Sequence, residues 1–242
     1  MKGNLIYKYF SLKCKGLKTL LSGNLYFSSP DYFNDPFEFG FVHRIEDLPL
    51  ERKLSLNFTV ETGNNILEIE EKWTSWLKVT RYSTDVEKYG VCCFSETKSS
   101  IIMWAHYADS HTGLCAGFDF NERLQNNNLQ FGNELLYCDK VRYDKIKREV
   151  PYRLQENTKE IYYVPWEIIY NKSKEWDYEE EIRIISQKMG LHEFPKETLK
   201  EIYFCNRVSE EKICKIKRIF SKRNLTGKST FLKKTLCNQR PV

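Results

Sequence analysis

The apolar residues of this 242-residue chain come in short runs that turn-forming and charged residues separate. Four of these runs have the length and composition of buried strands: residues 90–95, 113–120, 181–185 and 201–204. Between them, residues 99–109 and 209–222 each begin with a serine that can cap a helix. Strands and helices therefore interleave along the chain. No glycine-rich loop follows a strand, which argues against a Rossmann or P-loop nucleotide site.

The composition supports a packed soluble domain, because 41% of the residues are hydrophobic and 14% are aromatic, too many for a disordered chain. No internal repeat or low-complexity linker divides the chain, so we predict a single α+β domain over residues 1–242. Helical spacing predicts further helices over 66–77 and over 152–172, the latter with a break at Pro165. No run reaches the roughly 18 to 20 apolar residues of a membrane span, and residues 1–5 lead into no signal-peptide core. We therefore expect a cytoplasmic protein with no membrane partner.

The positive charge of the chain is concentrated at its end. The chain has 38 Lys plus Arg against 33 Asp plus Glu, a net charge of +5. Residues 205–242 carry 11 basic and two acidic side chains, a balance of +9, which leaves 27 − 31 = −4 for residues 1–204. We expect a basic helix over 209–222 followed by a basic tail. Such a segment is either a solvated amphipathic helix or a face for an anionic partner such as nucleic acid.

The eight cysteines show no metal-binding or disulfide pattern, because none forms a C-x-x-C pair and their spacing is irregular. Cys115 and Cys205 lie in apolar runs typical of packed strands. We predict reduced, mostly buried thiols and no bound metal.

The first polar motif is Phe33-Asn34-Asp35-Pro36-Phe37-Glu38. Asn-Asp-Pro favours a turn, and the flanking rings would anchor that turn to a core. This structural explanation accounts for the rings and the proline. Asn34, Asp35 and Glu38 would still present polar groups on an immobilised loop, where binding groups are often found.

The second motif runs from Trp104 to Gly113 and contains His106, Tyr107 and His111. A histidine just beyond a helix can simply complement the helix dipole. Two of the chain's four histidines nevertheless lie five residues apart here, which suggests a site. They do not match a metal motif such as H-E-x-x-H.

The third motif is Trp176-Asp177-Tyr178-Glu179-Glu180-Glu181-Ile182-Arg183-Ile184. Strand alternation puts Glu179, Glu181 and Arg183 on one face and the two isoleucines on the other. Like charges so close need compensation by Arg183 or by a ligand. The motif is therefore either a solvated strand face with an ion pair or a catalytic carboxylate pair at the edge of a cleft.

Together with Tyr7-Lys8-Tyr9 and Cys93-Phe94-Ser95, these three motifs resemble the bacterial and phage domain-of-unknown-function family 2971. That family resemblance implies no activity. The order of the parts is also similar to the ADP-ribosyltransferase fold, which implies a mixed or antiparallel split β-sheet core with flanking helices. In the arginine-serine-glutamate class of those enzymes the catalytic positions correspond here to Lys8, Ser95 and Glu181, with lysine standing where the class has arginine.

This resemblance implies an enzyme that consumes NAD, as an ADP-ribosyltransferase or an NAD glycohydrolase, in a toxin or phage-defence setting. Glu181 would stabilise the oxocarbenium-like state and Glu179 would orient water or a protein or nucleic-acid acceptor. The remaining residues assigned to the NAD site, for the pyrophosphate, ribose, nicotinamide and surrounding loop, are Tyr7, Lys8, Asn34, Asp35, Ser95, Trp104, Tyr107, His111 and Arg183.

Two other functions fit the same residues. The chain could be a non-catalytic nucleic-acid-binding module that uses residues 205–242, or a metal-dependent nuclease or other hydrolase built on Asp35, Glu38, Glu179 and Glu181. The transferase hypothesis makes a spatial demand that the others do not, because Lys8, Ser95 and Glu181 must then line one cleft.

Overall fold

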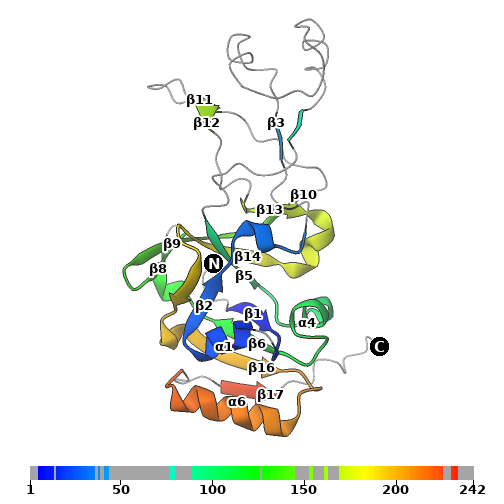
Figure 1. Cartoon of the computed structure of the whole chain (residues 1–242), viewed down its shortest axis with the longest axis vertical. Helices are drawn as coiled ribbons and strands as arrows, with labels where there is room; N and C mark the ends of the chain where they lie inside the picture. The colour runs from blue at the N-terminus through cyan, green and yellow to red at the C-terminus, as the bar shows by residue number, and fades with distance from the viewer. Residues whose placement is uncertain are drawn as a thin grey trace, which may run out of the picture.

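The computed structural model describes residues 5–13, 15–35, 38, 41–43, 77–79, 89–125, 127–144, 153–154, 161–162, 169–225 and 230–233 (Figure 1). Its centre is a nine-stranded sheet in the order β17-β16-β6-β1-β5-β14-β9-β8-β7. All neighbours in this sheet are antiparallel except β16 and β17. The strands are, in the same order, Thr230–Lys233, Leu199–Phe204, Leu114–Phe118, Ile6–Phe10, Gly90–Ser95, Glu181–Ser186, Glu134–Lys140, Asn128–Phe131 and Leu124–Gln125.

The sheet consists of two half-sheets that are joined at one point. Strands β1 and β6 share five register pairs, and β5 and β14 share six. Between β1 and β5 a single register pair, Tyr7 with Ser95, links the half-sheet β17-β16-β6-β1 to the half-sheet β5-β14-β9-β8-β7. Beyond this pair β1 and β5 diverge. The predicted α+β class with an antiparallel, split sheet core is thereby confirmed.

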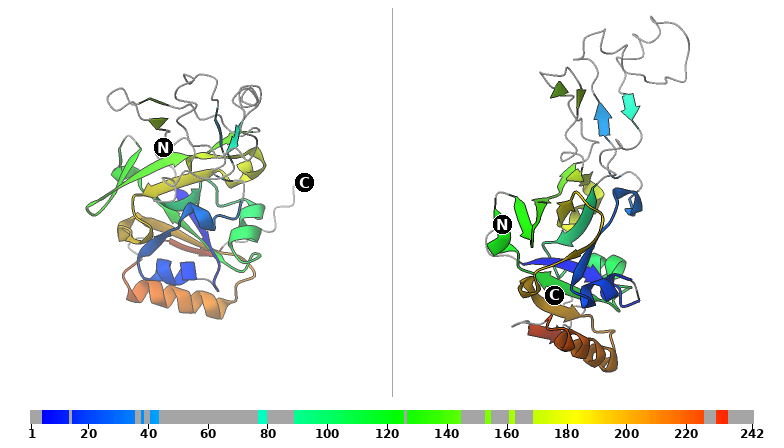
Figure 2. Two further views of the ribbon diagram at one scale, coloured as in Figure 1. Left: turned by 45° about the horizontal axis from the view of Figure 1, so that its top comes forward. Right: turned by 60° about the vertical axis from the view of Figure 1, so that its left-hand side comes forward.

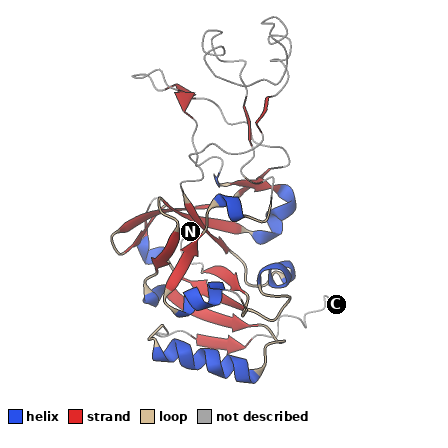
Figure 3. Cartoon of the chain, in the orientation of Figure 1, coloured by secondary structure: helices blue, strands red, loops and turns tan. Residues whose placement is uncertain are grey.

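Short elements complete the described fold. Four two-stranded ladders pair β2 (Asn24–Phe27) with β15 (Gly190–Glu193), β3 (Phe41–His43) with β4 (Leu77–Val79), β10 (Arg142–Asp144) with β13 (Asn171–Ser173), and β11 (Arg153–Leu154) with β12 (Ile161–Tyr162). The α-helices are α1 (Lys15–Leu21), α4 (Ile101–Tyr107) and α6 (Glu210–Lys222). The 3-10 turns are η1 (Pro30–Tyr32), η3 (Asn121–Arg123), η4 (Lys174–Glu179) and η5 (Lys196–Thr198). In Figure 3, α6 lies below the strands, α4 lies at their right, and α1 lies in front of them.

Helix α6 forms where the basic helix is predicted. Ser209 caps it by accepting a hydrogen bond from the backbone nitrogen of Lys212. Its apolar side chains at spacings of three and four, Ile213, Ile216 and Phe220, are buried. Both views in Figure 2 keep α6 beside β17 at the end of the first half-sheet. The basic side chains of α6 therefore lie on its outer face.

One face of β5 and β14 packs against a core of aromatic and aliphatic side chains. Ile182 and Ile184 of β14 are fully buried there, together with Phe94 of β5. Phe94 meets Phe118 edge to face, with ring centroids 5.6 Å apart. This packing fixes which face of β14 points away from the core, and Glu181 and Arg183 lie on that face.

Parts of the chain differ from the sequence-based predictions. The long helix predicted over 152–172 is wrong at β11, at β12 and at the first two residues of β13, which are strands, whereas Ile169 is helical. Strand β17 lies in the segment expected to be a tail. The helix expected over 66–77 falls outside the described residues, except that Leu77 begins β4. No helix of the described residues is long and apolar enough to cross a membrane.

Candidate functional site

A cavity of about 610 Å³ opens where β1 and β5 diverge. Such a volume is typical of sites for small molecules and cofactors. Tyrosines and phenylalanines make up much of its wall. Its lysine, asparagine and glutamate side chains converge from five separate elements or loops and are Lys8, Asn34, Lys172, Glu179 and Glu181, and Ser11, Ser28 and His106 also line it.

Glu179 and Glu181 reach this cavity because of a backbone turn between them. Turn η4 ends at Glu179, and β14 begins at Glu181. Glu180 has a φ of 43°, in the left-handed region, and caps η4 with its backbone nitrogen on the carbonyl of Asp177. Glu179 thus lies in η4 and not on the strand, yet its carboxylate lies near that of Glu181. Both belong to a buried acidic cluster whose members are Glu38, Lys172, Glu179, Glu181 and Arg183. The solvated strand face considered above is wrong, because Glu179, Glu181 and Arg183 are 3%, 4% and 0% exposed.

Two cations bind the carboxylates of this cluster. The ammonium of Lys172, from β13, lies 2.7 Å from Glu179 Oε2, 3.2 Å from Glu181 Oε2 and 3.6 Å from Glu38 Oε2. The guanidinium of Arg183 donates through Nε and Nη2 to the two oxygens of Glu181, each over 2.9 Å. Arg183 also donates to Glu38 and to the carbonyl of Ile169. Glu181 therefore accepts three charge-assisted hydrogen bonds, which fix its orientation.

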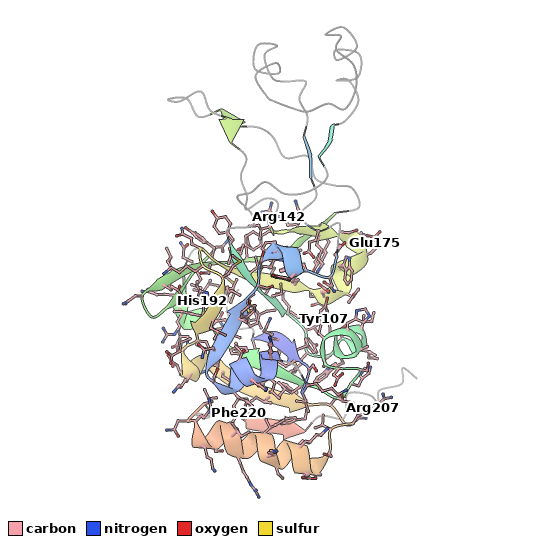
Figure 4. The ribbon with its side chains drawn as sticks, viewed as in Figure 1. Tyr107, Arg142, Glu175, His192, Arg207 and Phe220 are labelled. Atoms are coloured by element: carbon pink, nitrogen blue, oxygen red, sulfur yellow. The ribbon has the colours of Figure 1, made fainter. Side chains whose placement is uncertain are left out.

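A chain of hydrogen bonds links the cluster to α4 and to the loop after η1. Tyr107, which projects from α4 toward the middle of the molecule in Figure 4, donates its hydroxyl proton to Glu179 Oε1. The same hydroxyl accepts a hydrogen bond of 3.0 Å from the amide of Asn34. On the opposite side, the backbone nitrogen of Glu181 donates to the hydroxyl of Tyr143 over 2.7 Å.

Burial and charge act against each other in this cluster. Burial raises the pKa of Glu181 above its usual range, while Lys172 opposes this shift. Burial disfavours the ammonium of Lys172, but Glu181 and Glu179 outweigh it and raise the pKa of Lys172. Burial lowers the pKa of Arg183 to about 9, which leaves it protonated at neutral pH. With Glu38, the cluster holds three carboxyl groups and two basic side chains.

The structure brings six of the predicted site residues into the cavity wall: Tyr7, Lys8, Asn34, Tyr107, Glu179 and Glu181. Lys8 crosses the gap between the half-sheets and donates to the carbonyl of Cys93 over 2.8 Å. Ser95 is fully buried at the junction, where it is the register partner of both Tyr7 and Glu181. Its hydroxyl accepts from the backbone nitrogen of Thr97. Lys8 and Glu181 thus line one cavity, whereas Ser95 lies in the junction and not on the surface of the cavity.

The other four predicted residues lie outside the cavity wall. Trp104 is buried, packs edge to face on Tyr9 at 5.2 Å, and donates to the carbonyl of Lys98, so its ring is committed to the core. His111 ends a run of three left-handed residues after α4. Asp35 is buried, and its charge acts on Arg183, which itself lies behind Glu181.

Lys172 and Tyr143 are site residues that the sequence did not reveal. Lys172 falls in the segment expected to be helical, and a single lysine seven residues before Glu179 carries no recognisable signal. Tyr143 lies on the strand paired with β13, a contact that only the fold creates. Glu38 was noted as a loop carboxylate, but its partner Arg183 is 145 positions away.

The fold and this cavity define an α+β protein with a buried acidic cluster at a ligand-sized opening in a split sheet. Residues 103–184 match the family model described as protein of unknown function (DUF2971), over about a third of the chain. The chain is similar to that family over a segment that runs from α4 into β14 and contains Tyr107, Lys172, Glu179, Glu181 and Arg183. Comparison with curated proteins and with solved structures gave no match.

Proposed function

We propose that this protein is an enzyme that cleaves the bond between nicotinamide and ribose in NAD. The observation that carries the proposal is that Lys8 and the pair Glu179 and Glu181 line one cavity of about 610 Å³ at the split between the half-sheets. The order of parts resembles the ADP-ribosyltransferase fold, in which Lys8 and Glu181 would bind NAD. The third position of that pattern, Ser95, is buried in the junction and does not line the cavity. The aromatic wall suits the flat rings of such a substrate.

The charge of the cluster suits the chemistry. When the bond between the ribose carbon and the nicotinamide nitrogen breaks, the electron pair leaves with nicotinamide and positive charge develops on the ribose. Arg183 and Lys172 hold the carboxylate of Glu181 in place with three charge-assisted hydrogen bonds, and the thiol of Cys93 also contacts it. A fixed negative charge at this point stabilises the developing positive charge.

The other residues would bind and orient the reactants. The ammonium of Lys8 donates to the carbonyl of Cys93 and contacts the thiol of Cys92, and its positive charge would attract an anionic pyrophosphate. Tyr7 or Tyr107 would stack on nicotinamide, and Trp104 is committed elsewhere. Glu179 would accept the proton of the attacking water or acceptor hydroxyl as the new bond to ribose forms. Transfer and hydrolysis differ only in that nucleophile.

The nucleic-acid-binding function retains one supporting observation. Lys215, Arg218 and Lys222 share the exposed outer face of α6. If that face binds nucleic acid, affinity in the wild type should fall steeply with salt, and neutralising these three residues should flatten the dependence. A metal-dependent nuclease is not proposed, because the ammonium of Lys172 occupies the space among the carboxylates that a divalent ion would need.

The experiment is to incubate the protein with NAD, with and without candidate macromolecules, and to measure released nicotinamide and the mass of any adduct. Glu181→Gln should abolish nicotinamide release. Glu197→Gln is the control, because it changes an exposed carboxylate in η5, and it should leave release unchanged. Circular dichroism establishes that both variants fold. Absence of nicotinamide release by the wild type, or full turnover by a folded Glu181→Gln variant, refutes the proposal.

A further inference from the structure

Lys172 is the cation that lies among the three buried carboxylates of the site. The side chain of Lys172 is 3% exposed, and its ammonium contacts three carboxylates that are each 4% exposed or less. It also lies 5.0 Å from the centre of the Trp176 ring, which favours a cation at that point. A lysine so enclosed is rare unless it is paired.

We propose that Lys172 is a positioning residue: a built-in cation that keeps Glu179 and Glu181 ionised together and holds one oxygen of each at a common point. The effect on ionisation stands on the geometry of the cluster alone. Its consequence for catalysis rests on the proposed cleavage of NAD.

Removal of the Lys172 ammonium would leave the carboxylates of Glu179 and Glu181 without the donor that they share. Glu179 Oε2 and Glu181 Oε2 lie 2.7 Å and 3.2 Å from the same nitrogen, so without it two buried carboxylates face each other. Carboxylates that share a buried site cannot both ionise at little cost, and one of them takes up a proton. A protonated partner would no longer offer a fixed negative charge to the cavity.

No other described cation is placed to substitute for Lys172. The guanidinium of Arg183 is already bound to Glu181, Glu38 and the carbonyl of Ile169. The ammonium of Lys8 donates to the backbone of Cys93, across the gap between the half-sheets. Lys172 is thus the cation that bridges η4 and β14.

Several other groups face the carboxylate pair and contribute to its titration. They are Arg183 on β14, Glu38 and Asp35 in the loop after η1, Tyr107 on α4, Tyr143 on β10, Cys93 on β5 and Lys8 on β1. All of them are retained when only Lys172 is changed. A change in the titration of the pair can therefore be assigned to the loss of this one charge.

The test compares Lys172→Met, which keeps the length of the side chain without its charge, with Lys172→Arg, which keeps a charge. Carbon-13 NMR of labelled glutamate, assigned with Glu179→Gln and Glu181→Gln, follows the pair through a pH titration. The upper midpoint of the pair should rise by roughly one pH unit or more in Lys172→Met and stay near the wild-type value in Lys172→Arg. An unchanged midpoint in folded Lys172→Met overturns the proposal.

A measurement on the wild type covers the case in which Lys172→Met does not fold. Nitrogen-15 NMR of labelled lysine should show the Lys172 side chain protonated throughout the pH range in which the carboxylate pair ionises, because three carboxylates surround its ammonium. Loss of its proton within that range overturns the proposal without any variant.

Activity separates this inference from the proposed function. The acidic limb of the pH profile of nicotinamide release should move to higher pH in Lys172→Met by the same amount as the NMR midpoint. In Lys172→Arg the limb should lie near its wild-type position. If the wild type releases no nicotinamide, the proposed function fails while the titration still decides the role of Lys172. If the wild type is active and neither the limb nor the midpoint moves, the inference about Lys172 fails while the proposed function stands.

Discussion

Replacing Arg183 by methionine tests whether the buried charges on β14 are needed for folding. Arg183 is fully buried, and its guanidinium binds Glu38, both oxygens of Glu181 and the carbonyl of Ile169. Methionine fills much of the same volume without the charge. The substitution would leave two buried carboxylates and one carbonyl without their strongest donor.

The expected loss of stability follows from the contacts that Arg183→Met removes. Removing one partner of a buried ion pair typically costs about 3 to 5 kcal/mol, because the other charge stays buried. Arg123 provides the matched control, since it also pairs with a glutamate, Glu197, but the two side chains are 35% and 62% exposed. Loss of such an exposed pair costs about 0 to 1 kcal/mol.

Urea denaturation and thermal denaturation, each followed by circular dichroism, measure both variants. For a domain of this size, about 3 to 5 kcal/mol corresponds to a fall in the thermal midpoint of roughly 6 to 20 °C. Arg183→Met should show that fall, and Arg123→Met should stay within a few degrees of the wild type. Equal losses in the two variants, or a loss below about 1 kcal/mol for Arg183→Met, would refute the reasoning about buried charge.

Three further predictions concern parts of the fold outside the cluster. Gly113→Ala should destabilise the protein by about 1 to 3 kcal/mol in urea denaturation, because the added Cβ would lie 2.3 Å from the carbonyl oxygen of Phe10; a neutral effect would contradict this close packing. Ser209→Ala should cost about 1 kcal/mol in the same assay through loss of the cap of α6, and Ser209→Asp should restore it. Burial raises the pKa of Tyr170 above its ordinary value of 10.0, so above pH 10 the unfolded chain loses a proton that the folded chain keeps, and stability falls as pH rises. Tyr170→Phe should reduce the fall in urea stability between pH 10 and 11 by about 1 kcal/mol, since the tyrosine is already half ionised in the unfolded chain at pH 10, and an unchanged fall would show that Tyr170 ionises normally.

The strands of the central sheet could be predicted because their signal is local. Residues 90–95 are mostly apolar on both faces, residues 181–185 have one apolar face made by Ile182 and Ile184, and these segments form β5 and β14. The helix predicted over 209–222 is present as α6 for the same reason, since its apolar spacing and its capping serine lie within one short segment. The helix expected over 152–172 failed because its apolar spacing gave no indication of the ladders that this segment forms with β10 and within itself.

The site could be predicted only in part, because its electrostatics depend on residues far apart in the chain. The sequence identified Glu179, Glu181 and Arg183 as a group. It could not show that both faces of β14 are covered, and for that reason a solvated face was a reasonable alternative. The partners that make the burial of these charges possible, Lys172 and Glu38, come from a strand and a loop that the sequence did not place beside β14.

The single register pair between Tyr7 and Ser95 has a consequence for how the molecule opens. Amide hydrogen exchange reports cooperative units, and two half-sheets that share so little backbone pairing are expected to exchange as separate units with different opening free energies. A molecule bound in the cavity contacts β1 of one unit and β14 of the other. Its binding would therefore slow exchange in both units together, so that the ligand itself becomes part of what joins the two halves of the sheet.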